Sequence, residues 1–161
     1  MKIGVISDTH LKEPSPELLR LAGTVFKDVD MILHAGDIVS LQVLGAFQGK
    51  KVVAVRGNMD LPDSKSILND LEIIEADNFR IGLVHGWDSP SGLEQRIRKK
   101  FDRVDVIVYG HSHAPANHVV DGILFFNPGS FKSDWRSKEM TVGILTLGEK
   151  ITGEIIVVND G

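Results

Sequence analysis

The chain has 161 residues, 42% of them hydrophobic and 25% charged, a balance typical of one globular domain with a buried core, which we expect over residues 1–161. Its formal net charge of -4 argues against nucleic acid or an acidic membrane surface as a partner. The lack of cysteine excludes disulfides, thiolate zinc sites and cysteine nucleophiles and favours a cytoplasmic location, and no apolar run approaches the ~18 residues of a membrane helix.

Short strands and helices alternate along the first half of the chain. Runs rich in β-branched and aliphatic residues predict strands at residues 2–7, 31–34 and 52–55. Between them, Ser15 and Pro16 form a helix start that precedes apolar residues at helical spacing, and Ser40 opens a second, shorter helix. This alternation predicts a parallel sheet whose strands are connected by helices.

The rest of the chain favours antiparallel pairs of strands. Further apolar runs predict strands at residues 71–75, 80–84, 104–109, 118–120, 123–126, 141–147 and 151–158. The short connection Asp121-Gly122 favours a hairpin, and a capping box from Ser91 to Glu94 predicts the start of another helix. The expected fold class is α/β (α+β), with two sheets packed face to face and helices outside.

Polar side chains follow five of these strands, at the point where each strand ends. They lie in the segments Asp-Thr-His, Gly-Asp, Gly-Asn-Met-Asp, His-Gly and Gly-His-Ser-His, and the candidate ligands are Asp8, His10, Asp37, Asn58, His85, His111 and His113. Alone, Asp-x-His is more simply a polar loop and Gly-Asp a turn, whereas His-x-His is a stronger signal, because alternate residues of an extended segment point the same way. Because ligand sites of α/β sheets form outside the carboxyl ends of strands, we expect all five to meet at one edge of one sheet.

The chemistry of these side chains indicates a metal site. Four imidazoles, two carboxylates and one amide oxygen suit borderline or hard divalent ions, and they suffice for two ions when one carboxylate bridges them. Two such ions lie ~3.5–4 Å apart, hold a hydroxide between them and stabilise the charge that develops at phosphorus. The sequence therefore predicts divalent-metal-dependent hydrolysis of a small phosphate ester.

In this order, the five motifs resemble those of the calcineurin-like metallophosphoesterases. The short length and the segment Asn127-Pro128-Gly129-Ser130 resemble the compact branch that contains small phosphodiesterases and Vps29, and the resemblance extends from Met1 to about Ser130. It implies a four-layer α/β/β/α sandwich of two mixed sheets flanked by helices. It also implies two divalent metal ions, with Mn2+ favoured and Ni2+, Zn2+ or Fe2+ as alternatives.

The resemblance further implies a role for each candidate ligand. The first ion would be held by Asp8, His10, Asp37 and His113. The second would be held by Asp37, Asn58, His85 and His111, so that Asp37 bridges the two. Asp37, Asn58 and His85 would also serve catalysis, the last two by stabilising the transition state.

Two positions depart from the family pattern. Larger members have a histidine after the Gly-Asn asparagine that protonates the leaving group, whereas this chain has Met59. The sequence therefore favours a phosphodiester, or an ester with a good leaving group. The second departure is Trp87 where the family often has histidine; its ring could stack on an aromatic leaving group or could be a half-buried residue at the rim.

Several other residues are candidates for supporting roles. His34 is expected to orient a ligand, with a buried strand-end histidine as the alternative. Arg56 and Arg136 could clamp phosphate, although a solvated arginine is the simpler interpretation. His118 is expected on the surface of a hairpin. The turn at 127–130 is interpreted as structural. The basic run at 96–103 is interpreted as the solvated face of a helix.

The principal alternative is a Vps29-like protein-interaction scaffold with little or no catalysis. In such proteins a histidine of the second metal site is typically replaced by an apolar residue, whereas this chain retains His85, His111 and His113. This retention favours the enzyme. A metal-dependent nuclease is a weaker alternative, because no basic groove is evident. The sequence leaves the oligomeric state open, a homo-oligomer included.

Overall fold

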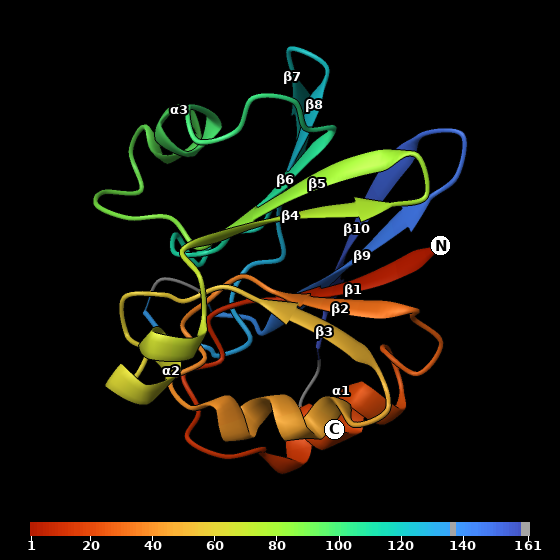
Figure 1. Ribbon diagram of the computed structural model, residues 1–161. Helices are drawn as coiled ribbons and strands as arrows, with labels where there is room; N and C mark the ends of the chain where they lie inside the picture. The colour runs from red at the N-terminus through yellow and green to blue at the C-terminus, as the bar shows by residue number, and fades with distance from the viewer. Residues whose placement is uncertain (136–137, 159–161) are drawn as a thin grey trace.

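Two five-stranded mixed sheets lie face to face between helices in the computed structural model, which describes residues 1–135 and 138–158 (Figure 1). The strand order is β10-β9-β1-β2-β3 in the first sheet and β4-β5-β6-β8-β7 in the second. Within the described part of the chain, no helix has the length and apolar character needed to cross a membrane.

The first sheet combines a parallel and an antiparallel part. Its strands are β1 (Lys2–Ile6), β2 (Met31–His34), β3 (Lys51–Ala54), β9 (Thr141–Leu147) and β10 (Ile151–Val157). β1, β2 and β3 pair in parallel, and β9 pairs antiparallel with both β1 and β10. The predicted strands of the first half are therefore confirmed.

Two helical segments connect the parallel strands of the first sheet. They are α1 (Pro16–Gly23) and the 3-10 helix η1 (Leu41–Phe47). The side chains of Ser15 and Ser40 cap them by accepting hydrogen bonds from the backbone N–H groups of Leu18 and Gln42. Both predicted helix starts are confirmed.

The second sheet is built around the parallel neighbours β5, β6 and β8. Its strands are β4 (Leu71–Ala76), β5 (Phe79–Val84), β6 (Val106–Val108), β7 (Ala116–Val120) and β8 (Ile123–Asn127). β4 pairs antiparallel with β5, and β7 pairs antiparallel with β8. Both hairpins agree with the sequence interpretation.

Two helices differ from the sequence expectations. A short helix, α2 (Pro62–Ile67), was not expected; it begins after Leu61 without a side-chain cap. The helix α3 (Leu93–Arg98) begins after Gly92, which has a left-handed backbone and provides no side-chain cap. The predicted capping box at Ser91 is therefore wrong, and Glu94 instead contacts Tyr109 and His118.

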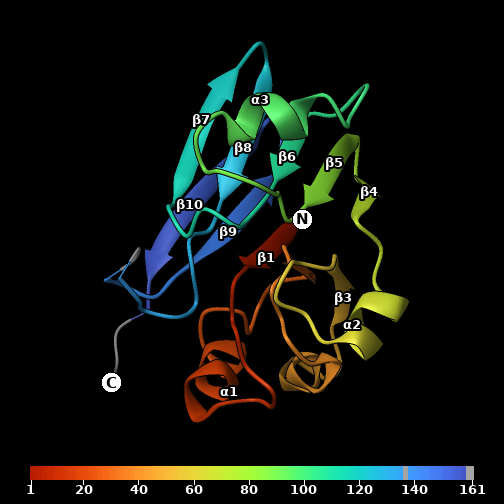
Figure 2. The same ribbon diagram turned by 90° about the vertical axis from the view of Figure 1, so that its left-hand side faces the viewer.

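Three hydrophobic clusters separate four layers. Successive residues of β1 belong to two different clusters: Val5 packs between the sheets, whereas Ile6 packs toward α1 and η1. The third cluster joins Ile97 and Phe101 of the α3 region to Ile107 of β6. Figure 2 shows α1 below the first sheet and α3 on the outer side of the second. These layers confirm the α/β/β/α sandwich.

Candidate metal centre

The predicted ligands are supplied by both sheets. Asp8, Asp37 and Asn58 follow β1, β2 and β3 of the first sheet, whereas His85 and His113 follow β5 and β6 of the second. The expectation of one edge of one sheet is therefore wrong. The sequence could not distinguish one edge from two, because strand order depends on packing between distant segments.

Two groups of side chains place their ligand atoms close enough to share a metal ion. The first contains Asp8, His10 and His113, and the second contains Asp8, Asp37 and His85. Within each group all ligand atoms lie within 4.8 Å of one another. Asp8 belongs to both groups, so the two potential sites are adjacent.

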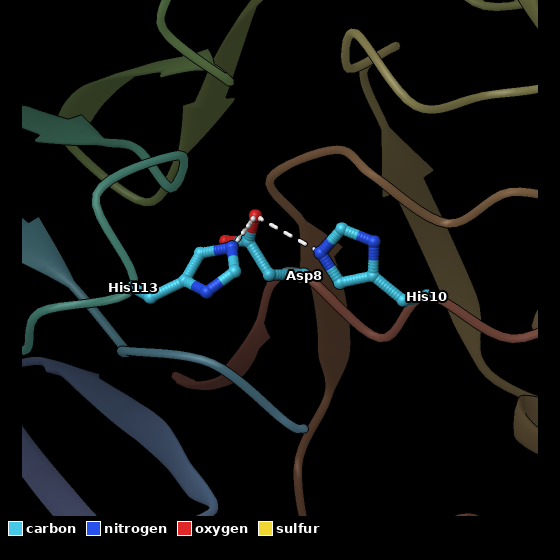
Figure 3. Close-up of side chains that lie close together, drawn as sticks. All are labelled: Asp8, His10 and His113. Atoms are coloured by element: carbon cyan, nitrogen blue, oxygen red, sulfur yellow. Dashed lines mark ion pairs between the residues drawn. The ribbon is translucent and has the colours of Figure 1, made fainter. Parts of the chain in front are cut away.

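The first group surrounds the carboxylate of Asp8 (Figure 3). Oδ1 of Asp8 lies 3.2 Å from Nε2 of His113 and 3.8 Å from Nε2 of His10. The two imidazole rings approach the carboxylate from different sides, His10 from the loop after β1 and His113 from the loop after β6. Their ring centroids are 5.4 Å apart.

The second group surrounds the carboxylate of Asp37. Oδ2 of Asp37 lies 3.4 Å from Nε2 of His85 and 3.7 Å from Nε2 of His10, so this oxygen faces both groups. Oδ1 of Asp37 accepts a hydrogen bond of 2.8 Å from the backbone N–H of Met59. Oδ1 of Asn58 lies 3.2 Å from Nε2 of His85.

His111 lies beside the second group, outside the two groups defined above. Its ring centroid is 5.2 Å from that of His85 in an edge-to-face arrangement. Its backbone N–H donates to Oδ2 of Asp8 at 3.2 Å, and its ring Nε2 donates to the carbonyl of Asp88 at 2.6 Å. The carbonyl contact leaves Nδ1 as the ring nitrogen with a lone pair.

The backbone at the site adopts a left-handed conformation at five predicted ligands. Their φ angles are 54° at Asp8, 50° at His10, 54° at Asp37, 69° at His111 and 60° at His113. This conformation is uncommon for residues other than glycine and is maintained only where surrounding contacts require it. Its concentration here indicates a functional constraint on the loops.

Hydrogen bonds with neighbouring groups orient the predicted ligands. Ser7 donates to Oδ2 of Asp8 at 2.6 Å. His85 donates from Nδ1 to the carbonyl of Ala35 at 2.6 Å, which directs its Nε2 toward the carboxylates. Nδ1 of His113 lies 3.0 Å from the carboxylate of Asp134. Such outer contacts fix the tautomer of a ligating histidine.

Sequence reasoning missed Ser7, Asp60 and Asp134. The buried carboxylate of Asp60 accepts hydrogen bonds of 2.7 Å from the backbone N–H groups of Val39 and Gly57, and so joins the loops after β2 and β3. Its place in Gly-Asn-Met-Asp could have indicated a supporting role. No local pattern marks Asp134, because it reaches His113 only through the fold.

Two glycines permit close approach of the loops. A Cβ atom on Gly57 would lie 2.2 Å from Oδ1 of Asp37, and one on Gly110 would lie 2.0 Å from Oγ of Ser7. Neither distance is compatible with a side chain. The glycines at these strand ends therefore have a steric role in the site.

Opposite charges control the protonation of the cluster. Burial raises the pKa of Asp8, but its close contact with His113 and the charge of His85 outweigh burial and lower it. Burial also raises the pKa of Asp37, but its contacts with His85 outweigh burial and lower the pKa to about 2. Burial lowers the pKa of His85, but the nearby Asp37 and Asp8 carboxylates raise it to about 8. The carboxylates are thus held ionised.

The donor set fits a metal ion. Among the described residues, buried Nε2 of His10 has no hydrogen-bond partner, and buried Oδ1 of Asp8 faces the Nε2 atoms of His113, His10 and His85, at 3.2, 3.8 and 3.9 Å. Buried polar groups are normally paired, and unpaired ones call for an unseen partner such as an ion. Carboxylate oxygens and imidazole nitrogens that converge in this way are suitable ligands for divalent transition metals.

A cavity of about 590 Å3 opens beside Asn58 and His85. Its wall includes Arg56, whose guanidinium donates to both carboxylate oxygens of Asp70, at 2.6 and 2.9 Å. The guanidinium of Arg56 is thus occupied by Asp70 rather than free to bind a phosphate group. Trp87 also lines the cavity and is partly buried, with the ammonium group of Lys100 5.4 Å above its ring.

The remaining candidates have supporting positions. His34 is fully buried; its Nδ1 accepts from the backbone N–H of Gly36, and its Nε2 lies 3.2 Å from the hydroxyl of Thr9. His34 therefore orders the loops that carry the ligands. His118 lies in β7, as expected for a surface hairpin, with Nε2 2.9 Å from the carboxylate of Glu94. Arg136 lies outside the described residues.

The turn at 127–130 lies against the ligand loops. The side-chain amide of Asn127 donates to the carbonyl of Gly110 at 3.1 Å. The hydroxyl of Ser130 donates to the carbonyl of Asp8 at 3.2 Å. These contacts agree with a structural role for the turn.

Other proteins are similar to this chain in sequence. A probable metallophosphoesterase of Methanocaldococcus jannaschii is 40% identical over 134 residues, which cover 81% of this chain and 68% of that protein. A phosphodiesterase of the same organism is 33% identical over 172 residues, which cover 98% of this chain and 99% of the relative.

Solved structures of other proteins are similar to this chain in fold. The structure of a novel archaeal phosphodiesterase has a TM-score of 0.78 and 30% identity, covering 98% of this chain and 99% of the other. The structure of vacuolar protein sorting 29 from Cryptosporidium parvum has a TM-score of 0.79 and 25% identity, covering 99% and 92%.

The α/β/β/α sandwich, with acidic and imidazole side chains clustered at the ends of its strands, defines a class of α/β proteins with a candidate metal site. Within that class, the model of the calcineurin-like phosphoesterase superfamily domain matches residues 1–150. The chain belongs to this superfamily, as its motifs indicated.

Proposed function

We propose that the chain is a divalent-metal-dependent phosphoesterase with a dinuclear centre, and that it acts on phosphodiesters. The observation that carries this proposal is the convergence of two ligand groups on Asp8, with the buried Nε2 of His10 left without a hydrogen-bond partner among the described residues. The phosphodiesterase relative and the family match support the reaction class.

Each ion would have its own set of ligands. Asp8, His10, Asp37 and His113 would hold the first ion, and Asp37, Asn58, His85 and His111 the second. The position of Asp37 Oδ2 between His85 and His10 supports a bridging role for that carboxylate. Two divalent ions, with Mn2+ favoured, would supply a bridging hydroxide as nucleophile and neutralise charge on the phosphoryl oxygens.

The protein prepares its histidines for this role. The bond from His85 Nδ1 to the Ala35 carbonyl leaves Nε2 as the ligand atom of the deprotonated ring. The bond from His111 Nε2 to the Asp88 carbonyl leaves Nδ1 as its ligand atom. His85 and Asn58, which line the adjoining cavity, would stabilise the transition state together with the ions.

The preference for a diester rests on position 59. Met59 is 56% exposed next to Asn58 and has no proton to donate. Without a general acid at that position, an ester with a good leaving group is favoured. The second candidate is a protein-interaction scaffold, which the similarity to vacuolar protein sorting 29 supports.

The test measures hydrolysis of bis-p-nitrophenyl phosphate and p-nitrophenyl phosphate with added Mn2+. An Asp37→Asn variant is compared with Asp28→Asn, which changes an exposed aspartate away from the site. We expect metal-dependent turnover, faster for the diester, that Asp37→Asn abolishes and Asp28→Asn preserves. No turnover by folded protein with any divalent ion would contradict the enzyme and favour the scaffold.

A further inference from the structure

Most residues that line the cavity beside the proposed metal centre have no proposed role in holding the ions. Its wall comes from the loop after β3, the helix α2, the start of β4, the end of β5 with the loop after it, and the segment after α3. Asn58 and His85 also belong to the wall, so the cavity is continuous with the proposed centre. A substrate whose phosphorus lies at the centre would extend part of its structure into this space.

The wall is positively charged although the protein is acidic. Arg56, Lys65 and Lys100 line the cavity, and Asp70 is the one carboxylate among the residues that do so. The whole chain has a formal charge of -4. Because Arg56 pairs with Asp70, the charge left to face a ligand is that of the two lysines.

Lys65 is held beside the proposed ligands. Its ammonium group donates to the carbonyl of Asn58 at 2.9 Å, and its own carbonyl accepts from Arg56 at 2.9 Å. The helix that carries it is anchored through the hydroxyl of Ser64, which donates to the carbonyl of Val39 at 3.1 Å. The position of Lys65 is thus fixed relative to the loop after β2.

Lys100 approaches the cavity from the second sheet side. Its ammonium group lies 5.4 Å from the centre of the Trp87 ring, a cation–π distance. Within residues 1–135 and 138–158, neither Lys65 nor Lys100 forms an ion pair with a carboxylate. Both ammonium groups therefore remain available to an anion.

We propose that this cavity binds a second anionic group of the substrate, a phosphate or phosphonate separate from the phosphoryl group that is hydrolysed, and that Lys65 and Lys100 determine this specificity. The proposal rests on the phosphodiesterase function proposed above and narrows its substrate class. Trp87 has a positioning role, because its ring holds the Lys100 ammonium over the cavity.

The test compares two phosphodiesters with the same leaving group: p-nitrophenyl ethyl phosphate and p-nitrophenyl 2-phosphonoethyl phosphate. We expect kcat/KM to be about tenfold higher for the second, the size of one charge-assisted contact. In Lys100→Met and Lys65→Met the ratio should fall toward one. Lys99→Met is the matched control, since Lys99 is exposed and does not line this cavity; it should keep the ratio.

A ratio near one in the unaltered protein would overturn the proposal, as would an unchanged ratio in Lys100→Met. If neither ester is hydrolysed, the proposed function fails, and binding then decides this proposal. The probe is ethane-1,2-bisphosphonate, titrated into metal-free protein while the indole N–H resonance of Trp87 is followed. A resonance shift that saturates, with an affinity for the bisphosphonate at least threefold weaker in Lys100→Met than in Lys99→Met, supports anion binding in the cavity. No shift, or equal affinities in the two variants, overturns the proposal.

Discussion

Nε2 of His113 lies 3.2 Å from Oδ1 of Asp8, although the two residues follow strands of different sheets. The carboxylate of Asp8 is fully buried and also accepts a hydrogen bond from the backbone of His111. The two sheets are therefore joined at the proposed metal centre by polar contacts as well as by the hydrophobic core. Changes that separate the sheets should impair metal binding before they unfold the protein.

Removal of the carboxylate that orients His113 should weaken metal binding. Nδ1 of His113 lies 3.0 Å from Asp134, and loss of such an outer partner typically lowers metal affinity about 10–100-fold. We expect this loss in Asp134→Ala, measured as the Mn2+ dissociation constant by calorimetry. Asp134→Asn keeps an acceptor oxygen and should lose less. Equal affinities in all three proteins would show that Asp134 does not orient the ligand.

Acid should destabilise the metal-free protein through His34. Burial lowers the pKa of His34 to about 3. In the unfolded chain the pKa of His34 is ~6.5, so below this pH the unfolded chain takes up a proton that the folded chain does not. The contribution of His34 to stability is therefore complete above pH ~6.5 and is lost as the pH falls toward 3. The free energy of unfolding should decrease by about 1.4 kcal/mol per pH unit in this window.

A His34→Asn variant isolates this contribution. Its side-chain oxygen can replace Nδ1 as the acceptor for the Gly36 N–H, but it does not titrate. Urea unfolding between pH 6.5 and 4.5 should show a shallower pH dependence in the variant than in the unaltered protein. Parallel curves would contradict the role of His34.

His85 contributes to stability in the opposite direction and at higher pH. Its pKa is raised to about 8, so its stabilisation is present below pH ~6.5 and is lost as the pH rises through 8.

A side chain at position 57 should disrupt the centre. A Cβ atom on Gly57 would lie 2.2 Å from Oδ1 and 2.3 Å from the backbone nitrogen of Asp37. We expect Gly57→Ala to lower the free energy of unfolding by about 1–3 kcal/mol, as overpacking does, and to reduce metal binding. Gly45→Ala is the control, because nothing lies within 4 Å of its added Cβ. Thermal unfolding and metal titration of both variants would reveal any failure of this expectation.

A histidine at position 59 should extend the range of leaving groups. The backbone N–H of Met59 donates to Asp37, so an imidazole attached there would lie next to the proposed centre. General acids contribute about 100-fold or more to reactions that need a proton at the leaving group. Met59→His should therefore accelerate hydrolysis of a phenyl phosphodiester more than that of a p-nitrophenyl diester. Met59→Leu is the control, and equal effects of both variants would argue against this role.

Local sequence was sufficient for most of the elements and for the identity of the candidate ligands. Ser15 and Ser40 start helices because their side chains cap free N–H groups of the next turn, an interaction that needs no distant partner. The alternation of Val5 and Ile6 indicates a strand with two buried faces for the same local reason. The polar residues after five strands were identified because the ends of strands in α/β folds are where ligands bind.

Only the tertiary structure decided how these elements combine. It placed His85 and His113 in a different sheet from Asp8 and Asp37, and it brought Asp134 to His113 and Lys65 to Asn58. These contacts join residues from separate elements, and their geometry depends on how whole layers pack. The sequence by itself thus determined which side chains are available for metal chemistry, because residue type fixes the ligand atom. Packing determined which of them lie close enough to share an ion and which charges line the adjoining cavity, because hydrophobic burial of both sheets sets their relative position.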